Sequence, residues 1–369
     1  MPHEPIYVTR PTLPPLEEYV AHLEDIWAAR YLTNAGPKHQ ALAKQLAAYL
    51  QVPNLVLFAN GHLALEAALQ TLGITGEVIT TPFTFVSTTL AIVRSGATPV
   101  FCDIDPTTYV MDPDLIESLI TPRTEAILPV HVYGNLCDDE RIAAIARKHG
   151  LKLIYDAAHT FGVSRNGVTS GQLGDISMFS LHATKVFNSI EGGVLTFGDE
   201  ALARPLRSWR QFGQLGSEDA ELVGTNAKLT EFAAAMGLCN LPYVDDTIAA
   251  RREVAERYRH NLSEVAGITL NPEAPGVRQN YAYFPVLFDP EAFGRDRDEV
   301  AATLARHDVY ARRYFHPLTS QMSAFAGRYP AEETPIAGAV AERVLTLPLY
   351  PDLPLSQVDR ICDIILNAG

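Results

Sequence analysis

The alternation of apolar strand segments with amphipathic helical segments between residues 55 and 156 most constrains how this chain can fold. Short runs rich in valine, isoleucine and leucine predict strands, and the segments between them have the apolar spacing of helices. The predicted strands are residues 55–58, 78–80, 99–103, 126–130 and 153–156, and the predicted helices are 62–72, 87–95 and 139–149. This order predicts an α/β fold with a mostly parallel sheet.

Four residues that could bind a ligand fall at or just after the ends of predicted strands: Gly61, Phe85, Asp156 and Ser180. The carboxyl ends of parallel strands meet at one edge of a sheet, and ligands of open α/β sheets bind there. We therefore expect these four residues to surround one site.

The regions on either side of this alternation predict further helices and a second domain. Residues 17–50 are expected to form helical pieces broken at 33–37, and residues 244–262 one long charged helix with Arg251 among its exposed residues. Short strands are expected at 282–287 and a helix at 297–307. We expect a large cofactor-binding α/β domain at 1–245, including the N-terminal helical segment, and a smaller α+β domain at 246–369.

Composition limits the classes of function. A chain of 369 residues with 47% hydrophobic residues is long enough for a sizeable core and two domains. The net charge of −14 argues against nonspecific nucleic-acid binding, which needs a basic surface. The four cysteines are far apart and form no CxxC pair, so we expect neither a metal site nor a disulfide framework.

No targeting or membrane segment is expected. The N-terminal residues lack the basic and apolar regions of a signal peptide, and no apolar run is long enough to span a bilayer. The expected location is the cytoplasm, with no membrane partner.

Lys185 follows an apolar strand segment and precedes Gly192 and Gly193, downstream of a strand that ends in Asp156. A lysine after a strand is usually a surface residue, and a carboxylate after a strand is often a helix N-cap. Together, in this order, they are typical of a pyridoxal phosphate (PLP) site. The lysine amine would form a Schiff base with the cofactor aldehyde, and Asp156 would pair with the pyridine nitrogen and keep it protonated.

The same reasoning assigns residues to the phosphate, the phenolic oxygen and the ring face of the cofactor. Gly61 and His62 precede or begin a predicted helix, so their backbone amides can bind a phosphate, to which Ser180 can add a hydroxyl. His159 could reach the phenolic oxygen of the ring, or it is a structural histidine. Phe85 could stack on the ring, or it packs in the core. The absence of a GxGxxG after a strand and of a P-loop argues against dinucleotide or ATP binding.

Eight segments of the chain together resemble the DegT/DnrJ/EryC1/StrS family of PLP-dependent nucleotide-sugar aminotransferases. They are YLTNAGP (31–37), NGHLAL (60–65), TPFTF (81–85), DIDP (103–106), PVHVYG (129–134), DAAH (156–159), SLHATKVFNSIEGG (180–193) and GTNAKLTE (224–231). The resemblance implies fold type I, the fold of aspartate aminotransferase. It also implies an obligatory homodimer, because Asn226 matches the family asparagine that reaches the phosphate of the neighbouring subunit.

The resemblance implies that Lys185 both binds the cofactor and carries out the proton shift. A family branch that replaces this lysine with histidine performs dehydration, so Lys185 favours amino transfer. Two departures stand out: His62 occupies a position where threonine is usual, and Phe212 and Gly213 replace a frequent His-Gly pair. Tyr314 and His316 match the family loop near the sugar and are candidate substrate contacts.

The function expected from the resemblance is transfer of an amino group from L-glutamate to a nucleotide-linked keto-deoxysugar. Residues 27–37 and 280–286 look most like the branch that converts dTDP-4-keto-6-deoxy-D-glucose to dTDP-4-amino-4,6-dideoxy-D-glucose. The product would serve O-antigen, lipopolysaccharide or other surface glycans. A 3-keto nucleotide sugar as acceptor, a PLP-dependent sugar dehydratase and a non-catalytic regulatory relative are the alternatives.

Overall fold

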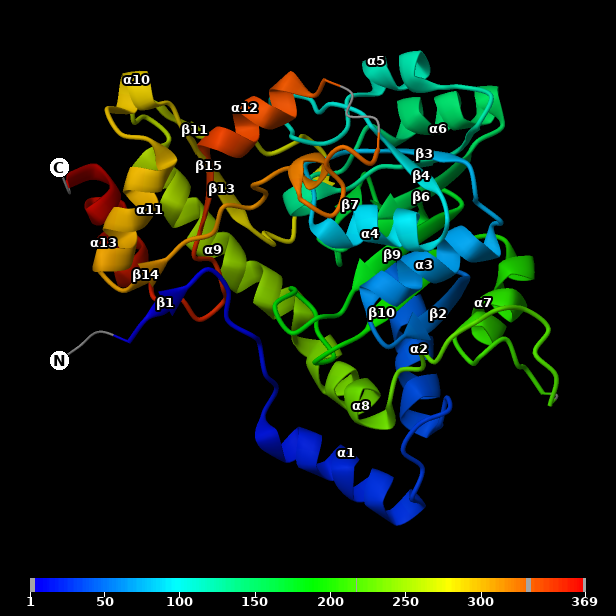
Figure 1. The fold of residues 1–369 in the computed structure, drawn as a ribbon. Helices are drawn as coiled ribbons and strands as arrows, with labels where there is room; N and C mark the ends of the chain where they lie inside the picture. The colour runs from blue at the N-terminus through cyan, green and yellow to red at the C-terminus, as the bar shows by residue number, and fades with distance from the viewer. Residues whose placement is uncertain (1–3, 217, 330–332, 368–369) are drawn as a thin grey trace.

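A seven-stranded sheet forms the centre of the larger part of the molecule (Figure 1), in a computed structural model that describes residues 4–216, 218–329 and 333–367. In spatial order its strands are β2 (Asn54–Phe58), β10 (Gly193–Phe197), β9 (Ile176–Ser180), β6 (Lys152–Asp156), β5 (Thr124–Leu128), β3 (Glu77–Thr80) and β4 (Thr98–Phe101). Strand β10 is antiparallel to both neighbours, and the remaining pairs are parallel. The predicted α/β fold with a mostly parallel sheet is confirmed.

Helices cover both faces of this sheet because strands buried on both sides present apolar side chains in both directions. One face packs against α3 (Gly61–Thr71), α4 (Val86–Arg94) and α7 (Ala203–Trp209). The other packs against α2 (Pro37–Leu50), α8 (Glu231–Asn240), α5 (Pro113–Ile116) and α6 (Asp139–His149). Helix α1 (Leu16–Ala29) lies outside these layers, at the bottom of Figure 1, and contacts α8.

The C-terminal part has its own hydrophobic core. It contains the strands β11 (Ile268–Leu270), β13 (Phe284–Phe288) and β15 (Val344–Leu347), packed against α9 (Val244–Leu262), α11 (Arg297–Arg306) and α13 (Leu355–Asn367). Two shorter helices are α10 (Pro290–Phe293) and α12 (Pro335–Arg343). The short strands β7 (Ser164–Arg165), β8 (Val168–Thr169) and β12 (Val277–Arg278) form a separate small sheet.

Helix α9 joins the two parts, and the N-terminal strand reaches back to the second one. Val244 and Ile248 of α9 pack with the helices of the large sheet, whereas Val254 and Tyr258 belong to the C-terminal core. Strand β1 (Ile6–Tyr7) pairs in parallel with β14 (Val309–Tyr310) of the C-terminal part. The domain boundary at residue 245 stays a prediction.

The prediction that Arg251 is exposed is wrong. Its side chain is fully buried, and its guanidinium donates to the carbonyl oxygens of Tyr281, Ala282 and Leu349 at 3.4, 3.5 and 3.3 Å. A run of charges on a helix usually marks a solvated face, but here the segments before β13 and after β15 cover Arg251. Burial lowers the pKa of Arg251 to about 10.

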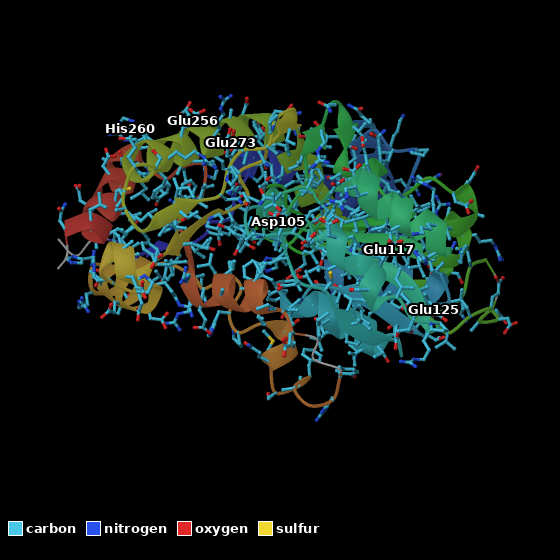
Figure 2. All side chains as sticks on the ribbon, turned by 90° about the horizontal axis from the view of Figure 1, so that it is seen from above. Asp105, Glu117, Glu125, Glu256, His260 and Glu273 are labelled. Carbon is cyan, nitrogen blue, oxygen red and sulfur yellow. The ribbon has the colours of Figure 1, made fainter. Side chains whose placement is uncertain are left out.

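Acidic residues lie on both parts of the molecule. Figure 2 labels Asp105, Glu117 and Glu125 on the larger part and Glu256 and Glu273 on the C-terminal part. The four cysteines are buried and unbridged.

Across the described ranges, we find no helix with the length and apolarity needed to cross a membrane and no cluster of metal ligands. Residues 1–3, which bear on the signal-peptide expectation, lie outside those ranges.

Candidate active site

A cavity of about 460 Å³ lies at the carboxyl edge of the large sheet, where the C-terminal part faces it. The ends of β2, β6 and β9 and the N-termini of α3 and α4 form one wall, and residues of the C-terminal part form the other. Eight predicted site residues line this space: Gly61, His62, Phe85, Asp156, His159, Ser180, Lys185 and Tyr314. His316 and Asn226 do not.

Asp156 ends β6 and is buried in the wall of the cavity. Its Oδ1 accepts a hydrogen bond from the Ala158 amide at 3.1 Å, and its Oδ2 accepts one from Thr88 Oγ1 at 2.7 Å. Burial raises the pKa of Asp156, while these hydrogen bonds and the charge of Lys185 lower it. Within the described ranges no arginine or lysine forms an ion pair with this carboxylate, so a cationic group in the cavity would supply the partner that a buried charge needs.

Thr88 is a site residue that the sequence analysis missed. It is fully buried on the first turn of α4, and its hydroxyl also lies 3.0 Å from that of Thr84, which lines the cavity. Helix α4 begins directly after Phe85, at the same edge of the sheet as Asp156, so its first turn is the natural source of a hydroxyl. A threonine at the start of a helix beside a ligand-binding edge was the available signal.

His159 presents one ring nitrogen to the cavity because the other is occupied. The backbone amide of Tyr133 donates to His159 Nδ1 at 3.1 Å, so the proton of the neutral ring is on Nε2. Tyr133 adopts φ of 59°, a left-handed conformation that a tyrosine rarely takes, and this directs its amide at the ring. Burial and the charge of Lys185 hold the pKa of His159 well below its usual range.

Lys185 reaches the cavity from the loop after β9. Its Nζ lies 3.3 Å from Tyr283 Oη and 5.7 Å from the centre of the Tyr283 ring. Tyr283 comes from the C-terminal part, just before β13, so the two parts of the molecule meet at this lysine. Sequence reasoning did not single out Tyr283, which lies 98 residues from Lys185 along the chain.

The N-terminus of α3 forms a cradle of backbone amides suited to an anion, here called the anion cradle. Asn60 caps this helix by accepting from the Leu63 amide at 2.9 Å, which leaves the first helical amides, of Gly61 and His62, directed out of its end. A Cβ on Gly61 would lie 3.3 Å from Ser180 Cβ, and one on Gly193 would lie 2.4 Å from the Asn60 carbonyl oxygen. Glycine is therefore needed at Gly193 to bring β10 this close to the helix end.

The His62 side chain bridges the two helices at the cradle. Its Nδ1 lies 3.0 Å from Ser87 Oγ of α4, and its Nε2 lies 2.9 Å from Glu66 Oε1, one turn further along α3. Glu66 is buried and also pairs with Arg94. The ring thus takes the place at the cradle where the family resemblance implies a threonine.

Phe85 is exposed for 57% of its surface and lines the cavity, so the alternative that it packs in the core is wrong. It is free to stack on a planar ligand, and its stacking on the cofactor stays a prediction.

Asn226 lies on the surface, away from the cavity of its own chain. Its Oδ1 accepts from Lys228 Nζ at 2.6 Å, and this ammonium group lies 4.8 Å from the centre of the exposed Phe212 ring. The asparagine and the loop in which Phe212 replaces the frequent histidine are thus neighbours. An exposed position is compatible with contact to a second subunit.

A groove of about 450 Å³ adjoins the cavity and shares Thr84, Phe85, Tyr314 and Phe315 with it. Among the described residues that line it, the basic ones are Arg312, Arg313 and His316, and none is a carboxylate. Arg313 pairs with Asp298 at 2.8 Å, and His316 lies 3.4 Å from Glu342. Over the parts of the chain that are described, the guanidinium of Arg312 has no hydrogen-bond or ion-pair partner.

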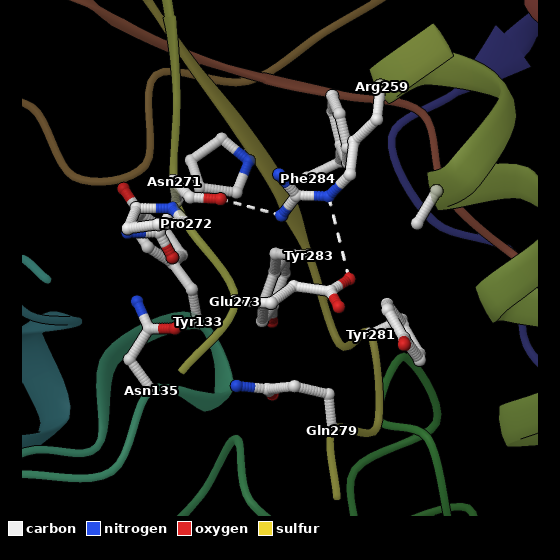
Figure 3. A pocket seen from close by; sticks show the side chains of 12 residues that line it. Tyr133, Asn135, Arg259, Asn271, Pro272, Glu273, Gln279, Tyr281, Tyr283 and Phe284 are labelled. Atoms are coloured by element: carbon white, nitrogen blue, oxygen red, sulfur yellow. Dashed lines mark hydrogen bonds and ion pairs between the residues drawn. The ribbon is translucent and has the colours of Figure 1, made fainter. Parts of the chain in front are cut away.

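A third space behind the cavity is too small for a substrate. It measures about 40 Å³ and shares Tyr283 with the cavity (Figure 3). Arg259 closes it by donating to the Asn271 carbonyl oxygen at 2.6 Å and pairing with Glu273 at 3.6 Å. This volume fits one or two water molecules, so we place the functional site in the larger cavity.

The donor set of the large cavity fits pyridoxal phosphate. Asp156 offers a buried carboxylate for a pyridinium nitrogen, and the amides of Gly61 and His62 with the Ser180 hydroxyl offer a phosphate cradle. Lys185 lies in the same space, within reach of an aldehyde bound between them. The volume also falls in the range of small-molecule sites.

Comparisons with known proteins agree with this geometry. The model of the DegT/DnrJ/EryC1/StrS aminotransferase family matches residues 16–366. Two relatives named dTDP-4-amino-4,6-dideoxy-D-glucose transaminase, from Shigella dysenteriae and Escherichia coli, are 41% and 40% identical, each over 98% of both chains. The crystal structure of DesI in the presence of its TDP-sugar product matches with a TM-score of 0.94 at 33% identity, over 98% of this chain and 92% of DesI.

Proposed function

Because the chain belongs to the DegT/DnrJ/EryC1/StrS aminotransferase family, we propose that it transfers an amino group from L-glutamate to a nucleotide-linked keto-deoxysugar, with pyridoxal 5′-phosphate as cofactor. The family and fold type expected from the sequence motifs are confirmed. The observation that carries the proposal is the meeting of Lys185, Asp156 and the anion cradle around one cavity.

The acceptor we propose is dTDP-4-keto-6-deoxy-D-glucose, which would yield dTDP-4-amino-4,6-dideoxy-D-glucose. The names of the two relatives at 41% and 40% identity support it. The groove beside the cavity supports a nucleotide-linked substrate, because together they measure several hundred Å³ and the groove offers Arg312 to a diphosphate. Tyr314, which lines both spaces, and His316 remain our candidates for contact with this substrate.

When bound, pyridoxal phosphate would supply an electron-withdrawing ring and a group that accepts and gives up an amine. Lys185 would hold the cofactor through its amine and would move a proton at the carbon atom that gains or loses the amine. The Tyr283 hydroxyl, at 3.3 Å, holds the lysine Nζ in place. Residues from both parts of the molecule line the space in which this proton would move.

Asp156 and His159 set the charge around the ring. Asp156, held by Thr88 and Ala158, would in its ionised form stabilise a proton on the pyridine nitrogen. His159 is neutral and carries its proton on Nε2, so it would donate to the phenolic oxygen without adding a charge.

The active enzyme we propose is a homodimer in which Asn226 of each subunit reaches the phosphate site of the other. The exposed position of Asn226 supports this arrangement. Leu16, Val20 and Trp27 are exposed at spacings that place them on one face of α1, and a second copy would bury them. We place the enzyme in the cytoplasm, where its amino sugar would enter O-antigen, lipopolysaccharide or other surface-glycan synthesis.

The test is incubation of the PLP-loaded enzyme with L-glutamate and a panel of 4-keto and 3-keto nucleotide sugars, with products identified by mass spectrometry and NMR. We expect a 4-amino dTDP-sugar and stoichiometric 2-oxoglutarate. An amine at carbon 3 would move the acceptor to the 3-keto class. Loss of water from the sugar without 2-oxoglutarate would indicate a dehydratase and overturn the proposal.

A further inference from the structure

His62 and Ser87 connect two helix N-termini at the anion cradle. His62 is the second residue of α3 and Ser87 is the second residue of α4, so their 3.0 Å contact joins the N-termini of two helices that open into the cavity. Both side chains line that cavity. A residue placed there either ties the helices together or acts on the bound anion.

Glu66 fixes one proton on the ring of His62. This carboxylate is buried, yet hydrogen bonds from His62 and Arg94 outweigh the effect of burial and lower its pKa. An ionised carboxylate accepts and cannot donate, so His62 Nε2, at 2.9 Å, carries a proton. The protonation of the opposite nitrogen, Nδ1, then decides what Ser87 does.

A neutral and a cationic ring leave Ser87 with different hydrogen bonds. If His62 is neutral, Nδ1 has only a lone pair, and the Ser87 hydroxyl must donate to it. If His62 is cationic, Nδ1 donates to Ser87 Oγ, and the Ser87 proton is free to donate into the cavity. The cationic state also brings positive charge to the helix ends, where an anion is stabilised.

We propose that His62 is a positioning residue for the cofactor phosphate: when the phosphate binds, His62 takes up a proton from solvent and turns the Ser87 hydroxyl toward a phosphate oxygen. The proton stays on Nδ1 while Glu66 holds Nε2, and it returns to solvent when the phosphate leaves. This inference rests on the proposed cofactor.

Other charged groups face the same space, and their proton uptake must be distinguished from that of His62. On α3 and α4 these are Glu66 and, through it, Arg94. From β6 and β9 and the loops after them come Asp156, His159, His182, Lys185 and Glu191, which all line the cavity. His182 provides a matched control, because its Nδ1 bonds to Thr184 Oγ1 at 2.9 Å and its Nε2 lies 3.6 Å from Glu191.

The experiment is calorimetric titration of the apo-enzyme with pyridoxamine 5′-phosphate, which forms no Schiff base with Lys185. Repeating it in buffers of different ionisation enthalpy gives the number of protons taken up. Wild type, His62→Gln, Ser87→Ala, the double variant and His182→Gln are compared from pH 6 to 9. Pyridoxamine without phosphate serves as the second probe.

We expect wild type and His182→Gln to take up more protons than His62→Gln, by a fraction approaching one, only when the probe carries phosphate. His62→Gln and Ser87→Ala should each bind pyridoxamine phosphate about 10- to 100-fold more weakly, the effect of one hydrogen bond to a charged group. The double variant should be no weaker than the single ones, because the two residues act as a unit.

Equal proton uptake by wild type and His62→Gln would overturn the proposal. So would unchanged affinity in Ser87→Ala. If His62→Gln lowers the melting temperature of the apo-enzyme but leaves affinity and proton uptake unchanged, His62 only ties the helices together. If wild type does not bind pyridoxamine phosphate at all, the proposed cofactor fails and this inference fails with it.

Discussion

Thr88→Val should weaken the enzyme through Asp156, although Thr88 is not a catalytic residue. The substitution keeps the shape of the side chain and removes the hydroxyl that donates to Asp156 Oδ2 at 2.7 Å. Both groups are buried, so water does not replace the lost bond. The ionised form of Asp156 loses support, and its pKa, already raised by burial, rises further.

The size of the effect follows from the chemistry of that bond. A hydrogen bond to a charged group contributes about 1.5–3 kcal/mol, which corresponds to about 10- to 150-fold in an equilibrium or a rate. We expect kcat/KM for the glutamate half-reaction to fall by about this factor at pH 8, with a smaller change in protein stability.

The sign of the pH dependence is also fixed. A carboxyl whose pKa is raised in the folded state costs stability when it is ionised, and Thr88 reduces that cost. The apo-form of Thr88→Val should therefore be less stable than wild type at neutral pH. The difference should shrink as the pH falls through the pKa of Asp156, where the carboxyl is neutral in both proteins.

Thr89→Val is the matched control. Thr89 is the next residue of α4, equally buried, and its hydroxyl bonds to Thr319 Oγ1 at 2.9 Å, a neutral partner. Single-turnover kinetics and thermal unfolding between pH 4 and 8 compare the two variants. If Thr89→Val lost as much kcat/KM as Thr88→Val, or if the stability difference of Thr88→Val were independent of pH, the reasoning about Asp156 would be refuted.

Three further predictions concern the cradle, the groove and the interface. Gly193→Ala places a Cβ 2.4 Å from the Asn60 carbonyl oxygen, so α3 must shift. We expect the affinity for pyridoxamine phosphate, measured by calorimetry, to fall at least tenfold. Unchanged affinity would contradict the claim that the N-terminus of α3 binds the phosphate. Arg312→Gln should weaken dTDP binding about tenfold. Arg313→Gln should weaken it less, because Arg313 is already paired with Asp298 at 2.8 Å. Equal losses of affinity would contradict the role of Arg312 as the residue that binds the diphosphate. Mixing inactive Lys185→Ala and Asn226→Ala subunits should restore activity, because one site of each mixed dimer is intact, and no recovery would argue against a shared site.

The local elements were predictable because their signals are local. The helices expected at 139–149 and 244–262 have those bounds in the structure. Apolar spacing marks both in the sequence, and Asp138 caps the first. The grouping of Gly61, Phe85, Asp156 and Ser180 around one cavity was predictable from topology, because parallel strands present their carboxyl ends at one edge.

The supporting contacts were not predictable, because they join distant parts of the chain. Thr88 and Asp156 are 68 residues apart, and Lys185 and Tyr283 are 98 apart, so no periodic pattern relates them. The amide of Tyr133 reaches His159 only through a left-handed backbone conformation, which tyrosine does not signal. The burial of Arg251 was not predictable, because a run of charges does not reveal that segments from another part of the chain cover that side of a helix.

The most direct test of the account is the visible spectrum of the PLP-loaded enzyme through both half-reactions. We predict that L-glutamate abolishes the absorption band of the lysine-bound cofactor, and that dTDP-4-keto-6-deoxy-D-glucose, added after glutamate is removed, restores it. Restoration only by another nucleotide sugar would keep amino transfer and change the acceptor. A band that glutamate never alters would contradict the central claim that this cavity moves an amino group from glutamate to a sugar.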